Sequence, residues 1–122
     1  MEKVIKIGTH EVKVMSNAAT PIRYRNAFGE DLLTILTKGT TKAGVDMTVA
    51  SDVAPKLAFI MAKSAEHADM NGLNEVSLMT WLEQFEAMDL VNATEDIFAV
   101  YFGDSKTDVE SKKKAKDEPK EN

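Results

Sequence analysis

One amphipathic stretch, residues 20–36, constrains the fold of this chain more than any other. Thr20 and Pro21 are typical of a helix start, because a hydroxyl can cap the first turn and a proline there loses no hydrogen bond. Apolar side chains then recur at helical spacing and form one stripe, made of Tyr24, Phe28, Leu32, Ile35 and Leu36. We therefore expect one central core helix over residues 20–36, with Gly29 in its interior marking a close contact or a slight bend.

Two segments near the N-terminus, residues 2–7 and 11–15, alternate apolar and polar side chains as β-strands do. Their apolar faces are formed by Ile5, Ile7, Val12 and Val14. The Gly-Thr-His sequence between the segments is short enough for a turn. Because an isolated hairpin is only marginally stable, we expect its apolar face to pack on the helix that carries Phe28 and Leu32.

A polar link with two glycines, residues 39–44, is expected to end the first helix. The second helix should begin at Ser51 or Asp52, with Pro55 in its first turn, and should stop at Asn71-Gly72. Its inner face is rich in small residues and consists of Leu57, Ile60, Met61, Ser64, Ala65 and Ala68. Such a face permits close packing against its neighbours.

Two more helices are expected before residue 103. The third begins near Ser77, and the fourth runs from about Val91 to Phe102. Their apolar stripes are Leu78, Trp81, Leu82 and Phe85 in the third, and the pairs Ile97/Tyr101 and Phe98/Phe102 in the fourth. The sequence thus predicts an α+β fold that is mainly α, with the N-terminal hairpin packed on a bundle of about four helices.

The charge pattern divides the chain into a domain, residues 1–103, and a tail, residues 104–122. The tail carries six lysines and six acidic residues with one sizeable apolar side chain, and we expect it to be disordered. The domain carries 9 Lys and Arg against 14 Asp and Glu, which accounts for the whole net charge of −5. Because an acidic body repels phosphate, nucleic acid is not an expected partner.

Several other classes of protein are disfavoured by what the sequence lacks. With no cysteine, thiolate catalysis, thiolate metal sites and disulfides are excluded. The sequence shows no signal-peptide pattern and no run of about 20 apolar residues, so a soluble, cytoplasmic protein without a membrane partner is expected. The two histidines, His10 and His67, do not have metal-ligand spacing, and no phosphate-binding loop or nucleophile motif occurs. We expect no catalytic, cofactor or metal site, and no enzyme.

The order of these segments resembles the tail assembly chaperone family of long-tailed phages (siphoviruses) that infect Gram-positive bacteria. After the N-terminal hairpin, the motifs that carry the resemblance are Arg23-Tyr24-Arg25, then Phe28-Gly29-x-Asp31-Leu32, the small-residue segment 57–62, and Trp81-Leu82-Glu83-Gln84-Phe85. The likeness covers roughly residues 2–103 and includes no catalytic motif.

The resemblance implies a chaperone that binds the long apolar tape measure protein and keeps it soluble during tail assembly in the host cytoplasm. Such chaperones are usually absent from the mature virion, self-associate, and in many cases exist beside a longer form made by ribosomal frameshifting. The run Lys112-Lys113-Lys114 is compatible with a slippery site and equally with a solvated tail. The alternatives are a minor structural or adaptor protein retained in the virion, and a small regulatory protein-binding module.

For the partner-binding surface, the sequence points to the densest aromatic group in the chain, because aromatic anchors dominate the energies of protein interfaces. The candidate residues are Trp81, Phe85, Met88, Phe98 and Phe102. The competing interpretation is that most of these side chains form the core. The two stripes of the fourth helix cannot both face one neighbour, which leaves one stripe for a partner or for another subunit.

Overall fold

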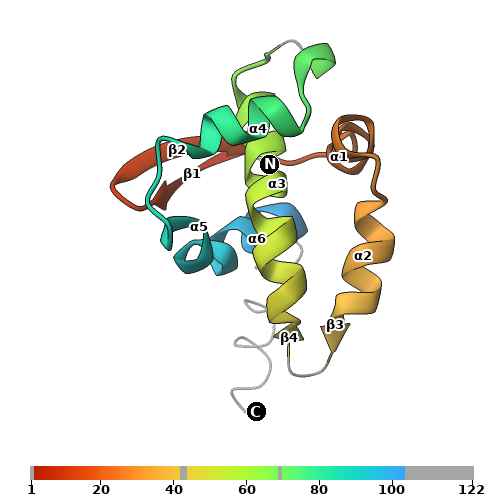
Figure 1. Cartoon of the computed structure of the whole chain (residues 1–122). Coiled ribbons are helices and arrows are strands. Elements are labelled where there is room, and N and C mark those ends of the chain that lie inside the picture. The colour runs from red at the N-terminus through yellow and green to blue at the C-terminus, as the bar shows by residue number, and fades with distance from the viewer. Residues whose placement is uncertain (1, 42–43, 69, 104–122) are drawn as a thin grey trace, which may run out of the picture.

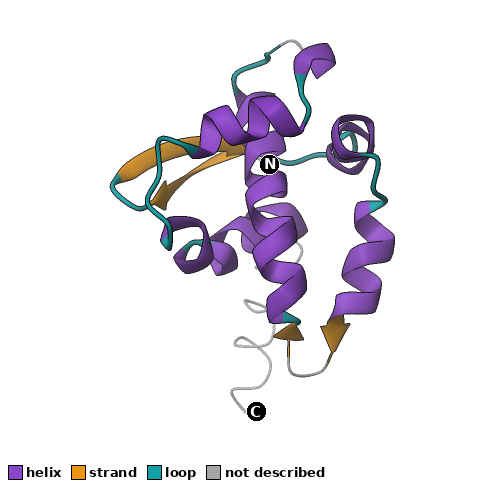
Figure 2. Ribbon diagram, viewed as in Figure 1, coloured by secondary structure: helices purple, strands orange, loops and turns teal. Residues whose placement is uncertain are grey.

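The structure is a computed structural model and describes residues 2–41, 44–68 and 70–103 (Figure 1). The tail expected to be disordered, residues 104–122, lies outside the described residues. In chain order the elements are β1 (Glu2–Ile7), β2 (His10–Met15), α1 (Thr20–Phe28), α2 (Leu32–Gly39), β3 (Thr40–Thr41), β4 (Gly44–Val45), α3 (Met47–Ala65), the 3-10 helix η1 (Met70–Gly72), α4 (Glu75–Leu82), α5 (Asp89–Asn92) and α6 (Thr94–Phe102). The fold is therefore α+β and mainly α, as predicted, with strands only in the hairpin and in one short two-residue ladder among the described residues (Figure 2).

Helix α3 forms the centre of the molecule, with the hairpin, α1, α4, α5 and α6 packed around it (Figure 1). Its side chains from Leu57 to Ala62 are almost completely buried on every side of the helix. A helix that is apolar all round is stable only inside a core, which explains its position. The prediction that residues 20–36 form the central helix is therefore wrong, because that stretch buries only part of its surface, while α3 buries nearly all of its surface between residues 53 and 65.

The stretch over residues 20–36 is two helices rather than one. Gly29 takes a left-handed conformation (φ +73°), and its N–H donates to the carbonyl of Arg25, which ends α1. A glycine at this position stops a helix because it has no Cβ to oppose positive φ. Asp31 then precedes α2 and accepts a hydrogen bond from the Thr34 hydroxyl (2.8 Å). Tyr24 and Leu32 are both fully buried, but they reach the core from different helices.

The N-terminal hairpin forms with the predicted apolar face, and its register places Ile5 opposite Val12 and Ile7 opposite His10, which begins β2 instead of lying in the turn. Its two-residue turn has Gly8 at φ +65°, as a turn with glycine at its first central position requires. The apolar face packs on α3, with β1 also touching α5 and α6. The expected contact with the Phe28/Leu32 helix is therefore wrong, because the break at Gly29 leaves α1 and α2 on another side of α3.

Other helix boundaries differ from the sequence predictions in ways that local chemistry explains. Helix α3 begins at Met47, so Pro55 lies inside it, and it ends at Ala65 rather than at Asn71-Gly72. Ala19, not Thr20, is the N-cap of α1, and the Thr20 hydroxyl instead accepts the backbone N–H of Asn17. Pro21 lies in the first turn of α1 as predicted, whereas Thr20 does not cap the helix and Pro55 lies in the interior of α3 rather than in its first turn.

The later helices also have other boundaries than expected. The side chain of Asn74 accepts the backbone N–H groups of Val76 and Ser77, while the Ser77 hydroxyl accepts the N–H of Asn74. This reciprocal capping box starts α4 at Glu75, two residues before the predicted start. The predicted fourth helix is split at Ala93 into α5 and α6.

Candidate partner-binding surface

The structure places Trp81 and Phe85 side by side, with Trp81 in the last turn of α4 and Phe85 in the segment that follows. The prediction that Phe85 belongs to the same helix is wrong, because α4 ends at Leu82. Their ring centroids lie 5.0 Å apart, and the Trp81 ring also packs 5.5 Å from that of Phe59 in α3. Phe85 meets the ring of His10 edge-on at 5.1 Å, and His10 Nε2 lies 3.1 Å from the carbonyl oxygen of Gln84. Both aromatic side chains are half-buried, so they join the hairpin to α4 and still present part of each ring to solvent.

The other three predicted contact residues lie elsewhere. Phe98 and Phe102 stack on each other in α6 with centroids 6.2 Å apart, but Phe98 is only 6% exposed and belongs to the core, whereas Phe102 is 42% exposed. Met88 is exposed in the segment between α4 and α5. The five residues therefore do not form one surface. Because Phe98 is buried, only Phe102 of the stacked pair is accessible to a partner.

A groove of about 440 Å³ runs along α4, and we call it the α4 groove. It is lined by Phe59, Lys63, Gly72, Asn74, Val76, Ser77, Thr80 and Trp81. Helix α4 forms one wall, while Lys63 of α3 and Gly72 of η1 form the other. Because Phe59 is fully buried, it supplies the apolar floor.

Beside this groove, α4 exposes an apolar stripe that the sequence analysis missed. Val76 and Met79 lie three residues apart on the same helix face and are 75% and 56% exposed. The signal was present, because the sequence of α4, EVSLMTWL, places apolar residues all round a helix of only two turns. Leu78 takes the buried position, so Val76 and Met79 remain outside.

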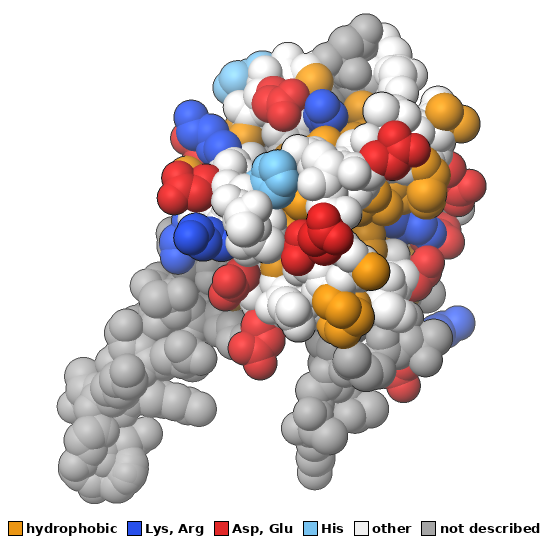
Figure 3. Space-filling view, turned by 60° about the vertical axis from the view of Figure 1, so that its left-hand side comes forward, with side chains coloured by type: hydrophobic (Ala, Val, Ile, Leu, Met, Phe, Trp, Pro, Cys, Tyr) orange, Lys and Arg blue, Asp and Glu red, His pale blue; other side chains and the backbone are white. Residues whose placement is uncertain are grey.

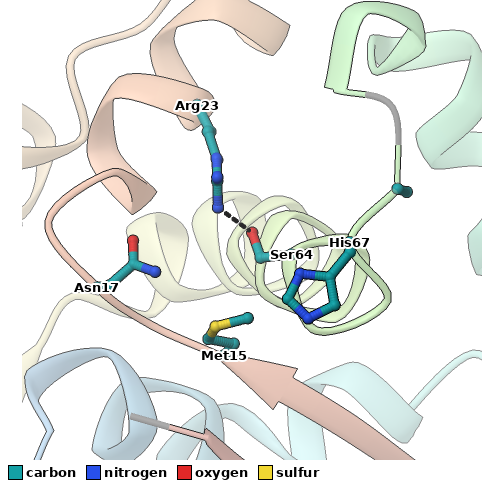
Figure 4. Close-up of a pocket in the computed structure, with 6 residues that line it drawn as sticks. Met15, Asn17, Arg23, Ser64 and His67 are labelled. Atoms are coloured by element: carbon teal, nitrogen blue, oxygen red, sulfur yellow. Dashed lines mark hydrogen bonds between the residues drawn. The ribbon is translucent and has the colours of Figure 1, made fainter.

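Charge on the surface is mixed rather than concentrated. On the face that Figure 3 displays, acidic and basic side chains are interspersed, and hydrophobic side chains reach the surface in separate groups. Arg23 points inward from α1 towards α3 and donates to the Ser64 hydroxyl (3.1 Å), beside His67 (Figure 4). This tether accounts for an arginine in the first turns of α1, where the helix dipole alone disfavours a cation.

A second polar cluster holds the α1–α2 connection against α3. Lys56 donates to Glu30 (3.1 Å), lies 3.5 Å from Asp52, and sits 5.6 Å from the centre of the Phe28 ring. The Tyr24 hydroxyl also donates to Glu30 (3.4 Å), and burial, together with the negative charge of Glu30, raises the pKa of Tyr24 far above its usual value. These groups satisfy one another, which makes the cluster a structural link.

Across the part of the chain that the structure describes, no group of three or more His, Asp or Glu side chains is placed to hold a metal ion. Among the same residues, no helix combines the length and the apolar character needed to cross a membrane. The α4 groove and the exposed Val76 and Met79 beside it form the candidate partner-binding surface.

Comparison of the chain with protein-family models, with curated proteins and with solved structures found no match.

Proposed function

We propose that this protein is a tail assembly chaperone of a siphovirus, and that its α4 groove receives apolar helical segments of the tape measure protein. The observation that carries the proposal is the exposure of Val76 and Met79 beside a groove walled by Trp81. In this view the protein acts in the host cytoplasm and leaves the tape measure before the virion is complete.

The shape of the site suits a helical partner. An amphipathic helix binds a groove through side chains spaced three or four residues apart, and Val76 and Met79 present apolar contacts at that spacing. Methionine adapts to partners of varied shape because its unbranched side chain has three rotatable bonds. A chaperone that covers many segments of one long protein requires this tolerance, and a short groove provides weak contacts that can be released.

The groove is also held rigidly, which reduces the entropy lost when a partner binds. The capping box of Asn74 and Ser77 fixes the start of α4, and Leu78 anchors the helix in the core. At the other end, the Trp81 ring is held between Phe59 and Phe85. Val76 and Met79 therefore lie on a helix that is already formed before a partner binds.

Co-expression with the tape measure protein encoded in the same phage genome tests the proposal. Replacing Val76 and Met79 with serine should leave the fold intact, since both side chains are mostly exposed, but should move the tape measure protein from the soluble to the insoluble fraction. The matched control is Leu33→Ser, which removes an apolar side chain that is 65% exposed on α2, away from the groove. The control should protect the tape measure as the unaltered protein does.

Two results would contradict the proposal. If the double variant has the thermal midpoint of the unaltered protein and still keeps the tape measure soluble, the α4 groove is not the binding surface. If mass spectrometry finds the protein in stoichiometric amounts in purified virions, a structural or adaptor role replaces the chaperone role.

A further inference from the structure

Strand β1 has one free edge. The sheet contains only β1 and β2 among the described residues, so the side of β1 away from β2 has no strand partner. Glu2, Val4 and Lys6 alternate along this strand on its outer face, and Val4 is 59% exposed. An exposed β edge that carries an apolar residue is a template for pairing with another strand.

The hydrogen-bonding groups at this edge can be assigned from the hairpin turn. Because the turn has two residues, the closing pair Ile7 and His10 exchanges hydrogen bonds between the strands, and every second pair along the ladder does the same. The N–H and C=O groups of Glu2, Val4 and Lys6 therefore point away from β2. None of them makes a backbone hydrogen bond to another element within the described part of the chain.

A groove lies next to this edge, where β1 approaches α6. It has a volume of about 510 Å³, and we call it the β1 edge groove. It is lined by Lys3, Val4, Ile5, Lys6, Asp96, Ala99 and Val100. Asp96 and Ala99 are exposed, so the α6 side of the groove is open.

We propose that the β1 edge groove receives β1 of a second copy of this chain, in an antiparallel pairing around a two-fold axis at Val4. In this register Val4 faces Val4 of the second copy, and Glu2 faces Lys6 of the second copy on both sides of the axis. The residues whose backbone groups point outward, Glu2, Val4 and Lys6, are then the ones that form the new ladder. The interface is isologous, as in most protein dimers.

Charge complementarity selects this register and this occupant. On the outer face, the hairpin already places Glu11 opposite Lys6, so the row across the dimer becomes Glu11, Lys6 and then Glu2 of the second copy, with alternating signs. Shifting the second strand so that the axis falls at Lys3 would bring two lysines face to face and would oppose Glu2 to Val4. A strand with a different pattern of charge would lack the two Glu2–Lys6 pairs, one on each side of the axis. A second copy of this chain is therefore the partner that fits.

This pairing requires no tape measure protein, and it gives the chain a four-stranded sheet whose two inner edges are covered. The first test measures the dissociation constant of the dimer by sedimentation velocity, with any purification tag at the C-terminus. Glu2→Lys and Lys6→Glu each place like charges in both new pairs and should each raise the dissociation constant at least about tenfold. The controls Glu83→Lys and Lys38→Glu make the same charge changes at exposed positions on other elements and should have no effect.

Restoring the opposite charges at positions 2 and 6 shows whether a single variant lost the dimer through charge repulsion or through damage to its hairpin. The double variant with both charges exchanged should form the dimer again, and an equimolar mixture of the two single variants should form a heterodimer. A monomeric unaltered protein at all concentrations would overturn the proposal. So would a dimer whose affinity neither single variant changes, or a mixture that fails to associate.

Cross-linking gives a second readout that does not depend on charge. The chain has no cysteine, so Val4→Cys introduces the only thiol, and the two-fold axis places its two copies about 5.5 Å apart between Cα atoms. A short bismaleimide should join them efficiently. Lys13→Cys, on the same face but separated from its copy by three strand spacings of about 4.8 Å, should react poorly. Equal cross-linking at both positions, or none at position 4, would contradict the proposed register.

Discussion

Gly8 in the hairpin turn lies directly against the carboxylate of Asp89 at the start of α5, so that a Cβ on Gly8 would overlap the carboxylate atoms. The same Asp89 oxygen, Oδ2, accepts the backbone N–H of Glu86 (2.8 Å) and is thereby held in place. The contact joins the N-terminal hairpin to the segment between α4 and α5. It makes glycine necessary at this turn for two reasons, the positive φ and the lack of space.

We therefore expect Gly8→Ala to destabilise the protein by about 1–3 kcal/mol, because the new methyl group meets both the strained backbone and the carboxylate. Urea denaturation measures the loss. Gly72→Ala is the matched control, since no atom lies within 4 Å of a Cβ at that position and its φ is not positive. Equal stabilities for the two variants would show that the turn does not contact α5 as described.

The stacked pair in α6 should respond unequally to truncation. Phe98→Ala removes a ring that is 6% exposed and should cost about 3–5 kcal/mol, while Phe102→Ala removes one that is 42% exposed and should cost under about 1 kcal/mol. Chemical denaturation of both variants provides the comparison. A small loss for Phe98→Ala would return that residue to the accessible surface and to the candidate partner contacts.

Lys56 should be important for stability although it is charged. Its side chain is 11% exposed and pairs with Glu30 and Asp52, so Lys56→Ala leaves Glu30, which is 37% exposed, without its cation. Because Glu30 can regain some water, we expect a loss of about 1–3 kcal/mol, less than for a fully buried pair. Lys13→Ala, which breaks an exposed pair with Glu2, should change the free energy of unfolding by less than about 1 kcal/mol. Equal effects would contradict the structural role of Lys56.

Asp31 should make stability depend on pH in the acid range. The hydrogen bond from the Thr34 hydroxyl, with smaller contributions from backbone N–H groups at the start of α2, lowers the pKa of Asp31 below its usual value. Since the carboxylate is favoured in the folded state, its contribution is present above the pKa of the unfolded chain and is lost as the pH falls through the lower, folded value. The thermal midpoint of Asp31→Asn should fall below that of the unaltered protein near pH 6, and the two should converge towards pH 2. A difference that stays constant over this range would contradict the assignment.

Local sequence patterns were sufficient for the two strands of the N-terminal hairpin and for the class of fold, but they did not predict the short ladder of β3 and β4. The alternation of apolar and polar residues around Ile5, Ile7, Val12 and Val14 predicts two β-strands with one apolar face, because every second side chain of a β-strand points to the same face. The presence of helices was equally clear from apolar spacing. Their ends were less clear, since Gly29 is compatible with a bent helix and with a helix stop until the left-handed conformation is seen.

The candidate site could be predicted only in part. Trp81 and Phe85 lie beside each other although α4 ends at Leu82 and only Trp81 belongs to it, whereas Phe98 lies in the core and Phe102 at the surface. Which of two apolar stripes becomes buried depends on what packs against the helix, and no pattern within the helix contains that information. For the same reason Val76 and Met79 became visible as surface residues only once Leu78 was found in the core.

By itself, then, the sequence determined the hairpin, the helical character of the domain and the charges along β1, because each depends on the spacing of neighbouring residues. Only the tertiary structure decided that α3 is the centre, that the hairpin packs on it, and that α4 borders a groove. These features depend on contacts between residues far apart in the chain. All elements pack against the same core, so the helix with apolar side chains on every face lies at its centre. The surrounding elements bury one face each and expose the other.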